Sequence, residues 1–411
     1  MDQKVTGTPP RYADRYPDLG TLPIPVAINQ DRYQYERERE LIFRPAWHLI
    51  GRVEEIPKVG DYFVQDIPTL ATSILAVRGK DNQVRAFHNM CRHRGNKVVS
   101  TGTLRGNGWG FSCAFHGWTY DLEGRLATVP DEDQFFNLNK CDYGLPAVHT
   151  GVWEGFIFVS LAAEQPEQLS AAIAEFGDQF QGYLSNLNLF AHFASTVQCN
   201  WKIILDAFAE SYHVPFIHGK TLPEAITGKL NPACHLQNIR IYEKNRSLSA
   251  KGNPEYQPTE LEAAIARFVG APVFPALKSD LAKLPPGVNP EKRPDWGFDI
   301  NIIFPTSYFA CWANGMLLVY HFWPTSESET RFEVKLYWNK PANAADKINQ
   351  EITRAMTVSV VREDMSSLET TQEVYNSNAI SHIHLSDQEI AVRHNYELVS
   401  KVTGCPLYAN S

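Results

Sequence analysis

The pattern of apolar and polar positions changes twice along the chain and divides it into three stretches. In residues 1–46, apolar positions recur at helical spacing among alternating charges, and Asp31 stands where a helix N-cap is expected. In residues 47–161, short β-rich runs follow one another between turn residues. Residues 162–411 mix helical patterns with later strands such as 315–322. The pattern predicts an α+β protein in which a helical segment and an all-β domain precede a mixed domain.

The composition restricts the classes to which the protein can belong. Its 411 residues exceed the usual size of one hydrophobic core, and 44% apolar residues allow substantial burial. A net charge of −8 gives no electrostatic footprint for nucleic acid. No apolar run is long enough to span a membrane, and the first residues show no signal-peptide pattern. Because seven cysteines, an odd number, argue against a disulfide framework, we expect a cytoplasmic protein without a membrane or nucleic-acid partner.

Four residues in the all-β stretch form the most informative motif. Cys91 and His93 form Cys-x-His, and Cys113 and His116 form Cys-x-x-His after a glycine-rich gap. Each of two loops thus offers one thiolate and one imidazole. A Rieske [2Fe–2S] cluster takes two cysteines on one iron and two histidines on the other, which matches this supply. A structural zinc site is the alternative, although zinc sites usually pair their cysteines within one loop.

The sequence around these four residues resembles the Rieske non-heme iron oxygenases, specifically their large (alpha) subunit. The loops read Cys-Arg-His-Arg-Gly at 91–95 and Cys-Ala-Phe-His-Gly-Trp at 113–118. The resemblance implies an all-β Rieske domain over residues 47–161 and a catalytic domain over residues 162–411, with an antiparallel sheet flanked by helices. It also implies that residues 1–46 form a helical segment that packs on the catalytic domain.

A second metal site is expected in the catalytic stretch. Residues 210–218 match the family's Asp/Glu-x-x-His-x4-His signature, which implies iron ligands at His213 and His218. Histidines five apart on a regular helix point about 140° apart, so we expect Pro215 to break the helix and to bring His218 back toward His213.

A mononuclear Fe(II) site for O₂ chemistry needs one carboxylate besides two histidines. Residues 363–372 resemble the family's Glu-Asp-x4-Glu-x2-Gln segment, and the resemblance assigns Asp364 as the third ligand. From the residues alone, Glu363, Glu369 and Glu373 compete with Asp364 for this role.

Two acidic residues precede the histidines. In the family, the carboxylate at the position of Glu210 connects the Rieske histidine of a neighbouring subunit, here His116, to a histidine of the mononuclear site, here His213. Three residues separate Glu210 from His213, which places both on one face of a helix. Asp206 lies one turn earlier and is expected either to face the iron and contact a polar substrate group or to cap a neighbouring element.

The proline-rich residues 251–295 contain a short helical pattern at 260–269. A connection of this kind is either disordered or a functional lid, and we expect a lid over the entrance to the iron pocket. Candidates for the pocket lining are apolar or aromatic, with ordinary core packing as the alternative for each: Ala207, Phe208, Phe216, Ile217, Phe304, Tyr308, Phe309, Trp312 and Leu318.

The resemblance implies a terminal oxygenase that uses O₂ and electrons from a separate NAD(P)H-dependent reductase, with or without a ferredoxin, to hydroxylate an apolar, aromatic or polycyclic substrate. It further implies a homotrimer, to which a small beta subunit can be added. The sequence contains no nicotinamide or flavin fingerprint, in agreement with a separate reductase. Oxidative N- or O-demethylation and attack on a quaternary amine are alternatives within the family. A pure electron carrier and a zinc-stabilised binding module are alternatives outside it.

Overall fold

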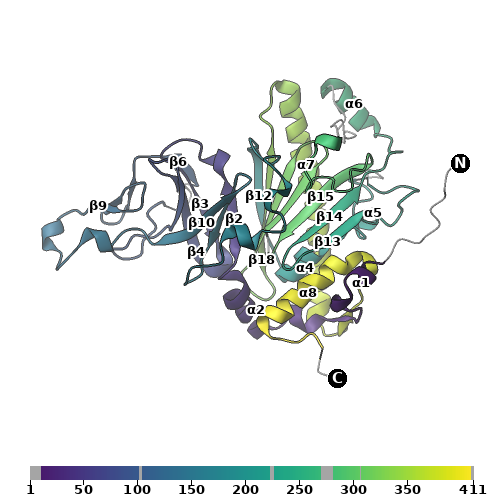
Figure 1. Cartoon of the computed structure of the whole chain (residues 1–411), viewed down its shortest axis with the longest axis horizontal. Coiled ribbons are helices and arrows are strands. Elements are labelled where there is room, and N and C mark those ends of the chain that lie inside the picture. Colours follow the sequence, from purple (N-terminus) through teal and green to yellow (C-terminus); the bar gives the residue numbers. More distant parts are fainter. Residues whose placement is uncertain (1–10, 101–103, 223–225, 270–280, 306, 409–411) are drawn as a thin grey trace.

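The computed structural model describes residues 11–100, 104–222, 226–269, 281–305 and 307–408. Two seven-stranded antiparallel sheets dominate this part of the chain, and Figure 1 shows them in an elongated molecule with one narrow end. The predicted α+β fold, with an all-β domain followed by a domain of antiparallel sheet and helices, is confirmed.

The first sheet has the strand order β2-β11-β10-β5-β4-β3-β6, and a three-stranded sheet, β7-β8-β9, forms the narrow end in Figure 1. A hairpin turn connects β4 to β5, and in it Asn82 adopts a φ of 64°. The strands are β2 (Trp47–Arg52), β3 (Asp61–Ile67), β4 (Thr72–Arg78), β5 (Val84–His88), β6 (Arg105–Asn107), β7 (Phe111–Ser112), β8 (Thr119–Tyr120), β9 (Leu126–Thr128), β10 (Ala147–Trp153) and β11 (Phe156–Ser160).

The second sheet has the order β12-β18-β17-β16-β15-β14-β13 and carries helices on its sides. Its strands are β12 (Asn188–Val197), β13 (Asn238–Ile241), β14 (Arg246–Lys251), β15 (Trp296–Ile303), β16 (Ser307–Trp312), β17 (Leu317–Pro324) and β18 (Thr330–Trp338), and a separate two-stranded ladder pairs β1 (Ile24–Pro25) with β19 (His382–Ile383). The helices are α1 (Tyr12–Arg15), α2 (Arg32–Glu38), α3 (Leu169–Ala172), α4 (Trp201–Ala207), α5 (Val214–Ile217), α6 (Glu260–Val269), α7 (Ala344–Asn376) and α8 (Ile390–Thr403).

The N-terminal helical segment lies against the C-terminal helix. Asp31 caps α2 by accepting a hydrogen bond from the Tyr33 N–H (2.8 Å), as the sequence predicts. The Gln34 amide donates to the Thr403 hydroxyl (3.2 Å), and Arg37 Nε donates to the Thr403 carbonyl (2.9 Å). These contacts attach α2 to α8, and thus to the catalytic half of the molecule (Figure 1).

The two large sheets are joined by a buried polar contact as well as by apolar packing. Lys335 on β18 is 3% exposed, and its ammonium group donates to the Ile50 carbonyl (2.9 Å) and to Gln65 Oε1 (3.1 Å) of the first sheet. Ile50 and Phe332 belong to one apolar cluster that both sheets share. The first domain therefore has a fixed position on the catalytic domain.

The proline-rich connection includes α6, which lies against α7. Residues 270–280 of the predicted lid lie outside the described residues. Within the described ranges, no helix is both long and apolar enough to cross a membrane.

Candidate functional site

The four predicted cluster ligands lie in two loops of the first domain. One loop, residues 91–95, follows β5, and the other, residues 113–117, connects β7 to β8. Each loop closes in the same way, because the N–H of Gly95 or Gly117 donates to the carbonyl of the cysteine four residues earlier. Both glycines have a φ between 70° and 80°, a conformation that favours glycine. The repeated Cys-to-Gly spacing thus builds two equivalent ligand loops.

The two loops bring their ligand side chains together. The ring centroids of His93 and His116 lie 4.5 Å apart. The buried Cys91 Sγ lies 3.4 Å from the Tyr120 hydroxyl, and the buried Cys113 Sγ lies 3.7 Å from the Asn96 amide nitrogen. Hydrogen-bond donors aimed at cysteine sulfurs stabilise thiolates, the form that binds iron.

The ionisation of these side chains also fits a Rieske cluster. Burial raises the pKa of Cys113, but hydrogen bonds from the Phe115 N–H and the Asn96 amide outweigh it, so the pKa is lowered. Burial lowers the pKa of His93, which favours the neutral imidazole that binds metals. Trp118 stacks on the His93 ring at a centroid distance of 5.0 Å and fixes its plane. Two thiolates and two neutral imidazoles can therefore hold the cluster.

The second group of metal donors consists of His213, His218 and Asp364, each of which offers one ligand atom within 4.8 Å of the others. Asp364 Oδ1 lies 3.0 Å from His218 Nε2 and 3.7 Å from His213 Nε2. This oxygen is buried and has no hydrogen bond of normal geometry among the described residues. Two imidazoles and a carboxylate that converge in this way fit a mononuclear Fe(II) ion.

The backbone that positions the histidines differs from the sequence prediction. The helix α4 ends at Ala207, and His213 and His218 directly flank the short helix α5. Pro215 lies in the first turn of α5, where proline is favoured because the N–H groups of that turn need no helical partner. The expectation that Pro215 breaks a helix between the histidines is wrong, since the break precedes His213.

The carboxylate of Glu363 contacts His218, one of the predicted iron ligands. Its Oε2 lies 2.8 Å from His218 Nδ1 and accepts a hydrogen bond from the Thr221 hydroxyl (2.6 Å). Burial lowers the pKa of His218, but the carboxylates of Asp364 and Glu363 outweigh it and raise the pKa. Glu363, which the sequence treats as a competing ligand, instead orients the imidazole. Its position directly before Asp364 in the motif is the signal that could have indicated this role.

Glu210 contacts His213 through a loop and not through a helical face. Its Oε1 lies within hydrogen-bond distance of His213 Nδ1. Its Oε2 accepts from the backbone N–H groups of Tyr212 and His213, the latter at 3.2 Å. The expectation that one helical face carries both residues is wrong, because α4 ends before Glu210. The turn nevertheless leaves the His213 Nε2 atom directed toward Asp364.

Asp206 is half-buried, with its Oδ1 atom shielded from solvent, and its Oδ2 accepts a hydrogen bond from the Tyr396 hydroxyl of α8 (2.6 Å). Burial raises the pKa of Asp206 to about 8, although the Tyr396 hydrogen bond acts in the opposite direction. The residue lines a cavity of about 310 Å³ together with Glu210, His213 and Asp364. Asp206 thus lies near the metal donors and is also tied to a neighbouring helix.

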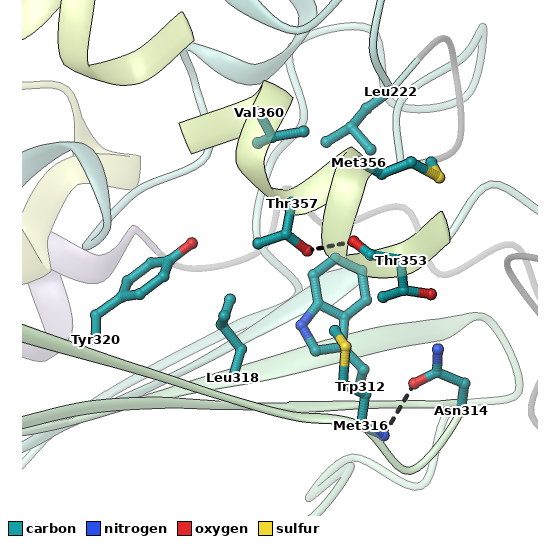
Figure 2. A pocket seen from close by; sticks show the side chains of 10 residues that line it. All are labelled: Leu222, Trp312, Asn314, Met316, Leu318, Tyr320, Thr353, Met356, Thr357 and Val360. Atoms are coloured by element: carbon teal, nitrogen blue, oxygen red, sulfur yellow. Dashed lines mark hydrogen bonds between the residues drawn. The ribbon is translucent and has the colours of Figure 1, made fainter. Parts of the chain in front are cut away.

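A second, mostly apolar cavity of about 80 Å³ lies between the sheet and α7 (Figure 2). Of the predicted lining residues, Trp312 and Leu318 line this cavity, and Ala207 and Ile217 line the larger cavity that contains His213 and Asp364. Phe216 is 72% exposed, and Phe208, Phe304, Tyr308 and Phe309 belong to the apolar clusters of the catalytic domain. The complete lining of the smaller, apolar cavity is Leu222, Trp312, Asn314, Met316, Leu318, Tyr320, Thr353, Met356, Thr357 and Val360.

Comparisons with known proteins agree with both metal sites. A family model described as "Rieske [2Fe-2S] domain" matches residues 46–147, and the model "Ring hydroxylating alpha subunit (catalytic domain)" matches residues 184–404. Together the two models imply a Rieske cluster, a mononuclear iron and O₂.

Two curated relatives match parts of the chain. The biphenyl 2,3-dioxygenase subunit alpha of Rhodococcus jostii (strain RHA1) is 31% identical over 220 residues, which are 51% of this chain and 47% of the relative. The carnitine monooxygenase oxygenase subunit of Acinetobacter baumannii is 30% identical over 181 residues, which are 44% of this chain and 48% of the relative. The chain spans about half the length of these relatives.

The fold is also shared with a solved structure, naphthalene 1,2-dioxygenase from Rhodococcus sp. bound to indole. The TM-score is 0.75 at 20% identity, and the match covers 95% of this chain and 96% of that one. The family model of the catalytic domain covers more than half of the chain, and the residues that converge at both sites fit its two metal centres. The chain is therefore a member of the ring-hydroxylating alpha subunit family, with an N-terminal Rieske [2Fe–2S] domain.

Proposed function

We propose that the protein is the terminal oxygenase of a multicomponent system, which uses O₂ and electrons from a separate NAD(P)H-dependent reductase to hydroxylate a neutral apolar substrate. The convergence of His213, His218 and Asp364 beside an apolar cavity carries this proposal. An iron ion held by His213, His218 and Asp364 would supply the activation of O₂. The surrounding chain has to bind the substrate, orient it and exclude water.

The cavity adjoins the metal donors along α7. Thr353, Thr357 and Val360 line it at helical spacing ahead of Asp364, so all four residues share one face of the helix. Val360 precedes Asp364 by four residues, a distance of about 6 Å along the axis. Leu222 lies four residues after His218 and also lines the cavity. A substrate in this cavity is therefore next to the metal site.

The chemistry of the lining favours a neutral substrate. Its ten residues include neither an acidic nor a basic side chain. A quaternary amine needs a carboxylate or several aromatic faces to compensate its charge, and only Trp312 and Tyr320 are aromatic here. Hydroxylation of an aromatic or polycyclic compound thus fits the cavity better than demethylation or oxidation of a quaternary amine.

The arrangement of the two metal sites supports electron transfer between subunits. Figure 1 places β9, in the domain of the cluster loops, at the opposite end of the molecule from α5, which the iron histidines flank. The cluster loops of one copy are thus far from the iron site of the same copy. We infer that Glu210 connects His213 to His116 of a neighbouring copy, in a head-to-tail homotrimer.

The proposal includes components outside this chain. A reductase, with or without a ferredoxin, supplies the electrons, and a small beta subunit can join the trimer.

The helix α6 lies against α7, which lines the cavity, and this supports a lid formed by residues 251–295.

A single-turnover experiment tests the proposed activity. The chemically reduced holoenzyme is mixed with O₂ and either the bicyclic hydrocarbon indane or L-carnitine. We expect hydroxylated indane, with label from ¹⁸O₂, and no oxidised carnitine. Oxidation of carnitine without hydroxylation of indane would instead support the quaternary-amine alternative.

A further inference from the structure

Tyr320 brings a hydroxyl group without a hydrogen-bond partner among the described residues to the wall of the apolar cavity. Tyr320 on β17 lines the cavity and is only 4% exposed. Its hydroxyl makes no hydrogen bond within the described ranges and is not among the fully buried unpaired atoms, so it borders the open space of the cavity. A hydroxyl without a partner in an apolar site is unfavourable, and an acceptor that binds to it gains the free energy of the new hydrogen bond.

One other polar group of the lining, the buried Trp312 Nε1, also has no hydrogen-bond partner, whereas the threonine and asparagine groups are paired or can reach water. The Thr357 hydroxyl donates to the Thr353 carbonyl (2.8 Å), as Figure 2 shows. Asn314 accepts a hydrogen bond from the Met316 N–H (3.0 Å). Asn314 and Thr353 are both partly exposed, so water can reach them. Figure 2 shows Tyr320 on the opposite side of the cavity from Asn314 and Thr353.

The position of the Tyr320 ring is fixed. It stacks on its cross-strand neighbour Tyr308 at a centroid distance of 4.8 Å and an interplanar angle of 18°. Phe208 packs on the same ring at 4.7 Å, and Phe332 at 5.0 Å. A ring held on three sides cannot turn its hydroxyl away, so the donor is preorganised for a ligand.

The Tyr320 ring packs on Phe208, the C-cap residue of α4 two residues before Glu210, so the ring lies toward the metal site. The charge of Asp364 acts on both Tyr308 and Tyr320, and burial, as the largest cause, raises the pKa of each well above its usual value. Tyr320 therefore stays protonated and can donate. An acceptor bound by Tyr320 lies at the side of the cavity that faces the iron ligands.

We propose that Tyr320 is a specificity-determining residue that donates a hydrogen bond to an acceptor oxygen of the substrate. This inference rests on the proposed function and narrows its substrate class to neutral apolar compounds that carry a carbonyl or ether oxygen. The remaining walls enclose the apolar part of the substrate. They are formed by Leu318, Met356, Val360 and Trp312.

The test compares two ligands of one shape, indane and 1-indanone, which differ by one carbonyl group. Binding is measured by calorimetry on the anaerobic, iron-loaded protein without reductase, for the wild type and for Tyr320→Phe. This substitution keeps the stacked ring and removes only the hydroxyl. We expect the variant to bind 1-indanone about tenfold more weakly and indane as the wild type does. The control Tyr33→Phe, which removes an exposed tyrosine hydroxyl outside the cavity, should leave both affinities within about twofold.

An infrared measurement gives a second readout. The carbonyl stretch of bound 1-indanone should move to lower frequency in the wild type and return in Tyr320→Phe. If the variant binds both ligands as the wild type does and the carbonyl band does not respond, the inference is overturned, while binding of indane still supports an apolar substrate. If neither ligand binds the wild type, the inference and the proposed substrate class both fail.

Discussion

At the scale of single residues, the carboxyl group of Asp206 couples the stability of the protein to pH. Burial raises its pKa from 3.8 to about 8, so the folded protein holds a proton that the unfolded chain releases. Stability from this group is fully present below about pH 4 and is lost as the pH rises toward 8. The charged and titratable groups that act on it are Lys202, Arg246, Glu389, Tyr375 and Tyr396.

We therefore predict that Asp206→Asn, which cannot ionise, weakens the loss of stability between pH 5 and pH 8. Over this range, the free energy of unfolding of the wild type should fall relative to that of the variant by more than about 1 kcal/mol. The thermal midpoint of the wild type should fall with it. Calorimetric scans of both proteins at pH 5, 6.5 and 8 measure the difference. Parallel pH profiles would show that Asp206 does not titrate in this range.

A second residue-scale prediction concerns Glu363, which orients His218 through a contact of 2.8 Å. Carboxylates that hold a metal-binding imidazole usually contribute about ten- to hundredfold to metal affinity. Glu363→Gln should thus weaken Fe(II) binding by this factor and leave the absorption of the [2Fe–2S] cluster unchanged. Titration with Fe(II) under anaerobic conditions measures the affinity. Glu373→Gln, an exposed position on the same helix, is the control, and equal affinities for both variants would refute the role of Glu363.

At the scale of elements, α7 holds the segment that carries the histidines. Glu369 Oε1 accepts from the Gln198 N–H (3.0 Å), and Gln372 Oε1 accepts from the Asn200 N–H (2.8 Å). Asn200 in turn caps α4 by accepting from the Lys202 N–H (3.0 Å). The Glu and Gln of the Glu-Asp-x4-Glu-x2-Gln motif thus attach the helix of Asp364 to the start of α4.

Removal of this attachment should affect both stability and iron binding. Gln372→Ala leaves the buried Asn200 N–H without its partner, at a cost of about 1–3 kcal/mol. We expect a lower unfolding midpoint and weaker Fe(II) binding, although Gln372 is no iron ligand. Chemical unfolding and Fe(II) titration measure the two effects. A variant with wild-type stability would show that the contact does not hold the elements together.

At the scale of the whole molecule, Lys335 joins the two domains. Lys335→Met keeps most of the side-chain volume but leaves the Ile50 carbonyl and Gln65 Oε1 without this donor. We predict that the two domains then unfold separately, with the Rieske domain first. Cluster absorbance and protein fluorescence, followed in the same thermal scan, would separate in the variant and coincide in the wild type. Coincident transitions in Lys335→Met would contradict the prediction.

The sequence predicts some features of the molecule and not others. The number of residues along the chain between contacting side chains explains much of the difference. The loops at 91–95 and 113–117 and the cap at Asp31 depend on near neighbours, so spacing alone indicates them. The contact between His218 and Glu363 joins residues 145 apart, and the cavity lined by Tyr320 needs the sheet and α7 to meet. No local pattern encodes such contacts. The start of α5 at Val214 was missed because proline both breaks helices and begins them.

The central claim is that one chain holds both a Rieske cluster and a mononuclear iron. Iron and acid-labile sulfide per chain, measured in anaerobically purified wild type and His213→Ala after reloading with Fe(II), test it most directly. We predict about three irons and two sulfides in the wild type, and about two irons with unchanged sulfide in the variant. Two irons in both proteins would contradict the mononuclear site, and zinc without sulfide would contradict both centres.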